Sequence, residues 1–260
     1  MTAVRTLTDT TTMLRRNLRR MRRYPTIPYI AGIPVFFLLL FVYVLGGTLG
    51  AGLGGSGSRS DYIAYLTPGI LLMTVAGAAT GTAIAVAIDM TEGIIARFRT
   101  MAISRASVLA AHVIGSVIQT MLALAIVTGV ALLIGFRSTT GPVEWLAAAG
   151  LLTLIAFAIT WLGVALGMVA DGVGSASNLP LPLLLLPFFG SGFVPTDSMP
   201  DPLRVFAENQ PFTPMIETLR GLVLGTPVGS SGVIAVAWCI AFSVVGYVWA
   251  MKLYTRNPAH

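Results

Sequence analysis

Residues 145–170 read WLAAAGLLTLIAFAITWLGVALGMVA and contain no charged side chain. An α-helix crosses the apolar part of a bilayer with roughly 20 such residues, so this stretch is long enough to span a membrane. The whole chain has the same character: 55% of its residues are hydrophobic, 10% are charged, and the mean hydropathy is +0.84. A soluble domain carries about a quarter charged residues. The composition therefore excludes an ordinary water-soluble protein and predicts an all-α membrane protein.

Six apolar segments of this kind divide the chain, which we predict to form a single transmembrane domain over residues 1–260. The fifth segment is short and contains Pro180, Pro182 and Pro187. Because proline removes a helical hydrogen bond, we expect this segment to be kinked or partly unwound. Six crossings place both termini on the same side of the membrane. The predicted spans are residues 27–49, 66–88, 108–134, 145–170, 179–194 and 233–251.

The basic residues predict which side that is. The N-terminal segment, the connection after the second span and the C-terminal segment together hold twelve arginines and lysines, whereas the opposite connections hold four. Connections rich in these residues face the cytoplasm, so we expect both termini and the second connection to be cytoplasmic. The four residues on the opposite side are Arg59, Arg137, Arg204 and Arg220.

The segment ahead of the first span, residues 5–23, predicts an amphipathic helix. At about 100° per residue, Leu7, Leu14 and Leu18 fall on one face and the arginines on the other. We expect this interfacial helix to lie on the inner leaflet with its arginines at the lipid head groups. Nucleic-acid binding would also explain the charge, but an arginine-rich face that continues into a span favours a membrane anchor and no nucleic-acid partner. The arginines predicted to contact lipid are Arg15, Arg16, Arg19, Arg20, Arg22 and Arg23.

Motifs for nucleotides and metals do not fit this fold. Residues 52–57 have the letters of G-x-G-x-x-G, but they follow a span instead of a strand, so we interpret them as an outer loop. A phosphate-binding G-x-x-x-x-G-K-[ST] loop needs a lysine, and the single lysine, Lys252, is followed by Leu253. One cysteine, Cys239, and two histidines do not make a metal centre. We expect no cofactor or metal on this chain and no ATPase activity of its own.

Small residues inside the spans predict where helices approach one another. Gly77 and Gly81 are four residues apart, as are Gly163 and Gly167, so each pair lies on one face of its helix. Such pairs allow close contact between helices, and packing alone explains them.

The residues can be compared with what two classes of membrane protein require. An ion-coupled secondary carrier needs a charged side chain within its spans, but Asp89 and Asp171 lie at the cytoplasmic ends of spans. A rhomboid-like intramembrane protease would use a serine of Gly-Ser-Ser-Gly at residues 229–232. No histidine follows that motif before His260, and His112 is predicted at the opposite side. The residues therefore disfavour both classes, and any driving force for transport is expected to come from another protein.

Two connections carry patterned residues. The cytoplasmic connection, residues 89–105, mixes both signs of charge with apolar residues at helical spacing, which predicts a short amphipathic helix that rests on the bilayer or holds a soluble partner. The outer connection, residues 195–232, predicts a re-entrant or interfacial helix capped by Thr213, with Pro214 in first position and Gly225 at its end. Its apolar face consists of Met215, Ile216, Leu219, Leu222 and Val223.

A closing signature precedes and overlaps this outer helix. It reads Ser191-Gly192-Phe193-Val194-Pro195, Met199-Pro200, Asn209-Gln210-Pro211-Phe212-Thr213-Pro214 and Arg220-Gly221. With the amphipathic N-terminal helix, the six spans and the charged second connection, it resembles the membrane subunit of type-2 ABC exporters, specifically the daunorubicin-resistance-like permeases of actinobacteria. The resemblance covers nearly the whole chain. Family members often have proline where this chain has Ala102 and a basic residue near His112.

The resemblance implies a permease of a bacterial plasma membrane that exports a hydrophobic or amphipathic compound, such as a drug-like molecule or a lipid. It implies a dimer, most simply a homodimer, that works with two copies of a separate ATP-binding subunit carrying ATP and Mg²⁺. By the same resemblance, the second connection contains the coupling helix that docks on that subunit. Residues that contact the cargo are left unassigned. The docking residues so implied are Asp89, Glu92, Gly93, Ile94, Arg97, Phe98, Arg99 and Met101.

Overall fold

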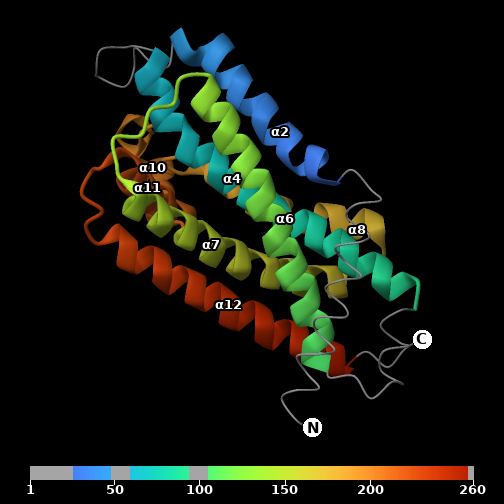
Figure 1. The fold of residues 1–260 in the computed structure, drawn as a ribbon. Helices are drawn as coiled ribbons and strands as arrows, with labels where there is room; N and C mark the ends of the chain where they lie inside the picture. Colours follow the sequence, from blue (N-terminus) through green and yellow to red (C-terminus); the bar gives the residue numbers. More distant parts are fainter. Residues whose placement is uncertain (1–25, 48–58, 94–104, 257–260) are drawn as a thin grey trace.

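The computed structural model describes residues 26–47, 59–93 and 105–256, and within these ranges all regular structure is helical (Figure 1). The predicted all-α class is confirmed for this part of the chain. Three predicted features lie outside the described residues: the N-terminal amphipathic helix at 5–23, the glycine-rich stretch at 52–57, and residues 94–104 of the cytoplasmic connection.

Four of the described helices are long and apolar enough to cross a membrane. They are α4 (Arg59–Thr91), α6 (Arg105–Leu133), α7 (Pro142–Val169) and α12 (Ser231–Arg256). Helices α4 and α7 are mostly buried within the protein, whereas a much smaller share of α6 and α12 is buried. Figure 1 shows α12 running beside α7, and α7 also contacts α4 and α6. The central pair of the bundle is therefore α4 and α7.

The first and fifth predicted spans correspond to shorter apolar helical segments, so the count of six crossings stays a prediction. The first continues from an α-helix into a π-helical turn. The fifth begins earlier than predicted, at Val173, and is divided into two short α-helices and a 3₁₀ turn. Pro180 precedes its second helix and Pro187 lies in the 3₁₀ turn, which agrees with the expected break. These elements are α2 (Thr26–Leu40), η1 (Phe41–Leu45), α8 (Val173–Asn178), α9 (Leu181–Leu185) and η2 (Leu186–Phe189).

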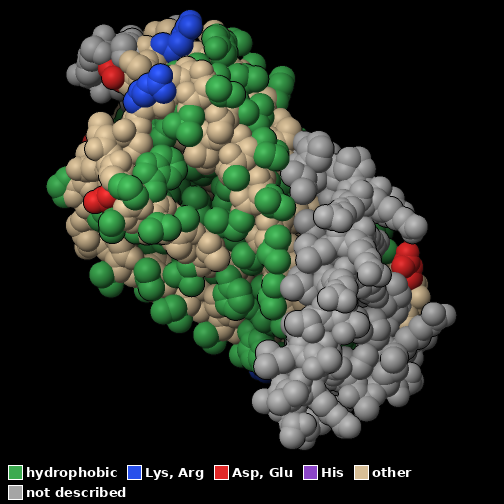
Figure 2. Space-filling view, viewed as in Figure 1, with side chains coloured by type: hydrophobic (Ala, Val, Ile, Leu, Met, Phe, Trp, Pro, Cys, Tyr) green, Lys and Arg blue, Asp and Glu red, His purple; other side chains and the backbone are tan. Residues whose placement is uncertain are grey.

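The surface of the bundle is hydrophobic where a soluble protein would be charged. In Figure 2, hydrophobic side chains cover much of the visible described surface, and the few charged side chains lie toward its ends. Large exposed examples are Phe36 on α2, Leu133 on α6 and Val233 on α12. Apolar surface of this extent is stable in a lipid environment and a liability in water.

One predicted pair of glycines lies at the contact between α4 and α7. A Cβ atom added to Gly163 would lie 2.7 Å from the Ala79 carbonyl oxygen, and one added to Gly167 would lie 2.5 Å from that of Ala83. The backbones can approach this closely because neither glycine has a side chain. Gly81, in contrast, would have no neighbour within 4 Å of an added Cβ atom and plays no such role in the described structure.

The outer connection folds into η3 (Thr196–Ser198), α10 (Asp201–Asn209) and α11 (Phe212–Leu224). Gly225 ends α11 with a φ of 71°, as predicted. The predicted Thr213 cap is wrong, because α11 already begins at Phe212.

Gln210 takes over the role expected of Thr213. Its Oε1 accepts a hydrogen bond from the Phe212 N–H at 3.0 Å. Its Nε2 donates to Thr213 Oγ1 at 3.0 Å, and that hydroxyl donates to the Ala207 carbonyl oxygen at 2.5 Å. The Thr213 side chain therefore joins α11 to α10.

The apolar face predicted for α11 packs against protein. Met215, Ile216, Leu219 and Val223 are buried, and α11 contacts α4, α7 and α12. Leu222 is only partly buried. Because this face is used inside the protein, the interfacial location of α11 stays a prediction.

Candidate functional site

The predicted functional residues lie at opposite ends of the bundle. Figure 1 shows the C-terminal ends of α4 and α12 near the start of α6 at one end, and α10 with α11 at the other. The first end contains the predicted coupling connection, and the second contains the closing signature.

At the first end, α4 continues through most of the described part of the predicted coupling connection. Asp89 lies within α4 and is fully buried, whereas Glu92 is exposed just beyond the helix. Gly93 adopts a φ of 66° and its N–H donates to the Met90 carbonyl oxygen at 3.1 Å, which closes the last turn. The other implied docking residues, Ile94, Arg97, Phe98, Arg99 and Met101, lie outside the described residues.

The Asp89 side chain faces α6 instead of solvent. Its Oδ2 lies 3.3 Å from Nε2 of His112, which is also buried. A buried carboxylate needs a partner of this kind because leaving it alone in an apolar interior is costly. The pair joins α4 and α6 at the positions where the chain leaves one helix and enters the other. The sequence contains both residues, but nothing in it indicates that they meet.

At the second end, Arg220 of α11 is held by α4 and by the segment after η2. Its Nη2 donates to the Ser191 carbonyl oxygen at 2.6 Å and to the Tyr65 carbonyl oxygen at 3.3 Å. Its guanidinium carbon lies 3.9 Å from the centre of the Tyr65 ring, and the Tyr65 hydroxyl donates to the Ser191 carbonyl oxygen at 2.8 Å. Burial lowers the pKa of Arg220, an effect that Tyr65 and Glu217 oppose. Arg220 thus connects three separate parts of the chain.

Two further residues of the closing signature, Gly192 and Phe193, pack closely against other elements. A Cβ atom on Gly69 would collide with the Gly192 carbonyl oxygen, so these two glycines allow the segment to press against α4. Phe193 stacks on Phe188 with ring centres 4.5 Å apart, and lies 5.1 Å from the ring of Phe41. These residues of the signature therefore contribute to packing at this end of the bundle.

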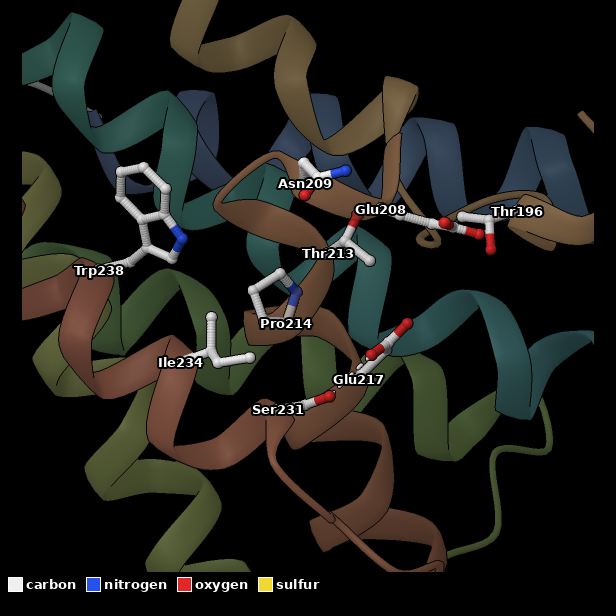
Figure 3. Close-up of a pocket in the computed structure, with 9 residues that line it drawn as sticks. All are labelled: Thr196, Glu208, Asn209, Thr213, Pro214, Glu217, Ser231, Ile234 and Trp238. Carbon is white, nitrogen blue, oxygen red and sulfur yellow. Dashed lines mark hydrogen bonds between the residues drawn. The ribbon is translucent and has the colours of Figure 1, made fainter. Parts of the chain in front are cut away.

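At this end of the bundle, a pocket of about 500 Å³ lies between α11 and α12 (Figure 3). Glu217 lines it from α11, and its Oε2 accepts a hydrogen bond from Ser231 Oγ at 2.9 Å. This pocket could not be predicted from the sequence, because its residues are spread over four elements and share no local motif. The lining consists of Thr196, Glu208, Asn209, Thr213, Pro214, Glu217, Ser231, Ile234 and Trp238.

One rim of the pocket carries a charged network on α10 and η3. Arg204 Nε donates to Glu208 Oε1 at 2.8 Å, and Arg204 Nη2 lies 3.0 Å from Asp197 Oδ1. The hydrogen bond to Glu208 raises the pKa of Arg204, and the charges of Glu208 and Asp197 add to that effect. Because the network is exposed, it contributes little to stability.

The geometry around Ser231 does not support the protease alternative. A serine nucleophile needs a histidine base in hydrogen-bond reach. Ser231 instead donates to the carboxylate of Glu217, and His112 pairs with Asp89 at the other end of the bundle. The Gly-Ser-Ser-Gly letters therefore mark the start of α12 and one wall of the pocket.

The chain is similar to a known protein family and to named permeases. The family model described as ABC-2 type transporter matches residues 8–224. The chain is 27% identical over 256 residues to a daunorubicin resistance ABC transporter permease protein of Streptomyces coeruleorubidus, covering 96% of this chain and 87% of the relative. It is 25% identical over 242 residues to a protein of Mycobacterium tuberculosis named as a probable doxorubicin resistance ABC transporter permease, covering 93% of this chain and 86% of that relative.

The family match covers most of the chain, and both relatives are matched over nearly their full length. Their names and the four long apolar helices describe the same kind of molecule, a membrane permease. The chain belongs to the ABC-2 type transporter family and is a multi-pass membrane permease of an ABC transporter.

Proposed function

We propose that this chain is the membrane-spanning subunit of an ATP-driven exporter that moves a hydrophobic or amphipathic compound out of the cytoplasm or the inner leaflet. The observation that carries the proposal is the ABC-2 match over residues 8–224. The relatives support the cargo class, because both are named as drug resistance permeases. A drug-like molecule or a lipid fits the apolar helix surfaces, which would also suit contact with the bilayer.

The energy for transport comes from a separate ATP-binding subunit. The single lysine, Lys252, is followed by Leu253 and cannot belong to a phosphate-binding loop of the G-x-x-x-x-G-K-[ST] type. We propose two copies of that subunit, with ATP and Mg²⁺ bound there, and a homodimer of this permease in a bacterial plasma membrane. The arginines of residues 5–23 hold the inner leaflet, and both termini are cytoplasmic.

The coupling connection passes the movement of the ATP-binding subunit to the spans. Glu92, Arg97 and Arg99 make polar contacts with that subunit, while Ile94 and Phe98 fill an apolar socket on it. The contact between Asp89 and His112, 3.3 Å apart, supports this route because it ties the exit of α4 to the entry of α6. Movement of the ATP-binding subunit then displaces the connection, and α4 and α6 move together. Asp89 acts by positioning the connection.

The outer half of the permease forms the exit for the cargo. The helix break at Pro180 and Pro187 leaves a segment that can rearrange more readily than a continuous helix. This segment leads to the contacts of Arg220, which connect it to α4 and α11. Movement of α4 therefore also moves the segment that forms the exit.

The decisive experiment replaces Arg97 and Phe98 together with alanine in a permease coexpressed with the ATP-binding subunit. We expect the subunit to stop copurifying and its ATP turnover to lose stimulation by the permease. The matched control is Arg204→Ala with Phe206→Ala, which removes the same two side-chain types from exposed positions at the other end. If copurification and stimulation persist in the first variant while it is correctly inserted, the coupling assignment is wrong.

A second measurement separates this mechanism from an ion-coupled carrier. Vesicles that contain the permease and its ATP-binding subunit should export cargo with ATP and no ion gradient. Transport driven by a proton gradient in the absence of ATP would contradict the proposal.

A further inference from the structure

The pocket between α11 and α12 combines a carboxylate with an apolar wall. Figure 3 shows Trp238 on one side, and Glu208 and Glu217 on the other. Ile234 and Trp238 project from α12, and Pro214 from α11. At about 500 Å³ the pocket has the size of a site for a small organic molecule, typically about 300–1,000 Å³.

The charge of the lining is negative. It contains two carboxylates and no lysine or arginine. Glu208 is paired with Arg204. Glu217 is half-buried, accepts a hydrogen bond from Ser231, and has no ion pair within 4 Å among the residues that the structure describes. The neighbouring Arg220 donates to the Ser191 and Tyr65 carbonyl oxygens, and its charge acts on Glu217 without forming an ion pair within 4 Å.

A half-buried carboxylate with one hydroxyl donor has acceptor capacity left for a cation. Within the described part of the chain no three His, Cys, Asp or Glu side chains are grouped to hold a metal ion, so the site does not suit an inorganic cation. Trp238 and Ile234 instead suit the apolar body of an organic ligand, and an indole face also attracts a positive charge.

We propose that this pocket binds an amphipathic organic cation, with Glu217 holding its cationic group and Trp238 its apolar body. The inference rests on the proposed export function in one respect: only if the chain is an exporter is the pocket a binding site for cargo on the outer side. The cargo class is thereby narrowed from hydrophobic or amphipathic compounds to positively charged ones.

The test measures equilibrium binding of two probes to the purified permease without its ATP-binding subunit. Tetraphenylphosphonium and tetraphenylborate have nearly the same shape and opposite charges. We expect saturable binding of the phosphonium and weaker binding of the borate. Glu217→Gln should weaken phosphonium binding about tenfold, or about 1.4 kcal/mol, and leave borate binding no weaker, because the Coulombic attraction between the carboxylate and the phosphonium charge is lost. Equal binding of both probes by the wild-type protein would overturn the proposal.

Matched variants separate the pocket from general effects. Glu144→Gln makes the same chemical change at the start of α7, outside the lining, and should leave binding unchanged. Trp238→Ala should weaken both probes, whereas Trp249→Ala, on the same helix and outside the lining, should weaken neither. The Trp238 and Trp249 pair also provides the test if Glu217→Gln does not fold. Phosphonium binding that is unaffected by both Glu217→Gln and Trp238→Ala would place the ligand elsewhere and refute the assignment.

The two proposals fail in different assays. If the wild-type permease binds the phosphonium selectively but neither copurifies with nor stimulates an ATP-binding subunit, the export mechanism fails and the pocket stands. If stimulation is normal but binding shows no charge selectivity, the pocket assignment fails and the export mechanism stands.

Discussion

Arg220 shows how one residue of the closing signature organises the end of the bundle that contains α10 and α11. Its guanidinium contacts two backbone carbonyls and an aromatic face at once. A planar guanidinium suits this arrangement, whereas a lysine ammonium is a compact charge on a flexible stem. The planar shape of the guanidinium, together with its positive charge, therefore suits Arg220 to this position.

We predict that Arg220→Lys lowers stability by about 1–3 kcal/mol although it keeps the charge, because hydrogen bonds to buried carbonyls are lost. The single cysteine, Cys239, is buried, so a thiol-reactive dye reports unfolding during a thermal ramp. Arg204→Lys, at an exposed position on α10, is the control and should change the midpoint little. A midpoint that Arg220→Lys leaves unchanged would show that charge alone suffices.

At the scale of elements, the contact between α4 and α7 depends on two side chains being absent. Gly163 and Gly167 bring the α7 backbone against Ala79 and Ala83. Both neighbouring atoms are backbone atoms, which cannot move aside as a flexible side chain can. The central pair of helices is therefore sensitive to a single methyl group at either position.

We predict that Gly167→Ala destabilises the permease by about 1–3 kcal/mol, because the added Cβ overpacks the contact with α4. Gly150→Ala makes the same change on α7 where nothing lies within 4 Å, and it should be neutral or slightly stabilising because alanine favours a helix. The dye assay on Cys239 compares the two variants. Equal midpoints would mean that α4 and α7 do not approach as closely as the structure shows.

Local sequence patterns predicted some features of the elements and missed others for a physical reason. Gly225 ends α11 as predicted, because a helix end at a positive φ is decided by the residue itself. The Thr213 cap is wrong because α11 begins one residue earlier, at Phe212; the Thr213 hydroxyl donates to α10, and Gln210 accepts from the first N–H of α11. The hydrogen-bond partner of a hydroxyl depends on which element packs against it in the folded protein.

At the scale of the whole molecule, the placement of arginine and lysine predicts how the permease is oriented in the membrane. The proposed orientation puts the Asp89 end of α4 in the cytoplasm and the pocket beside Glu217 outside. Both the site of ATP-driven coupling and the exit of the cargo follow from that single assignment.

We predict that a membrane-impermeant maleimide labels Thr226→Cys in intact cells and labels Glu92→Cys only after permeabilisation. Both positions are exposed in the structure, and Cys239→Ala supplies a background without reactive thiols. The opposite labelling pattern would show that the permease has the reverse orientation in the membrane, and it would contradict the proposed export direction.

The sequence by itself determined that the protein is surrounded by lipid and that it is helical. It also determined the positions of α4, α6, α7 and α12 and the resemblance to ABC exporter permeases. These follow from hydropathy summed over roughly 20 neighbouring residues and from a signature read in order, both of which are local properties of the chain.

Only the tertiary structure decided which side chains meet. Tyr65 and Ser191 are 126 positions apart, and Arg220 is 155 positions from Tyr65. The pair of Asp89 with His112 likewise joins two helices, and the pocket beside Glu217 is lined by residues of four elements. Such contacts depend on how the helices pack against one another, which is a property of the folded molecule and of no single segment.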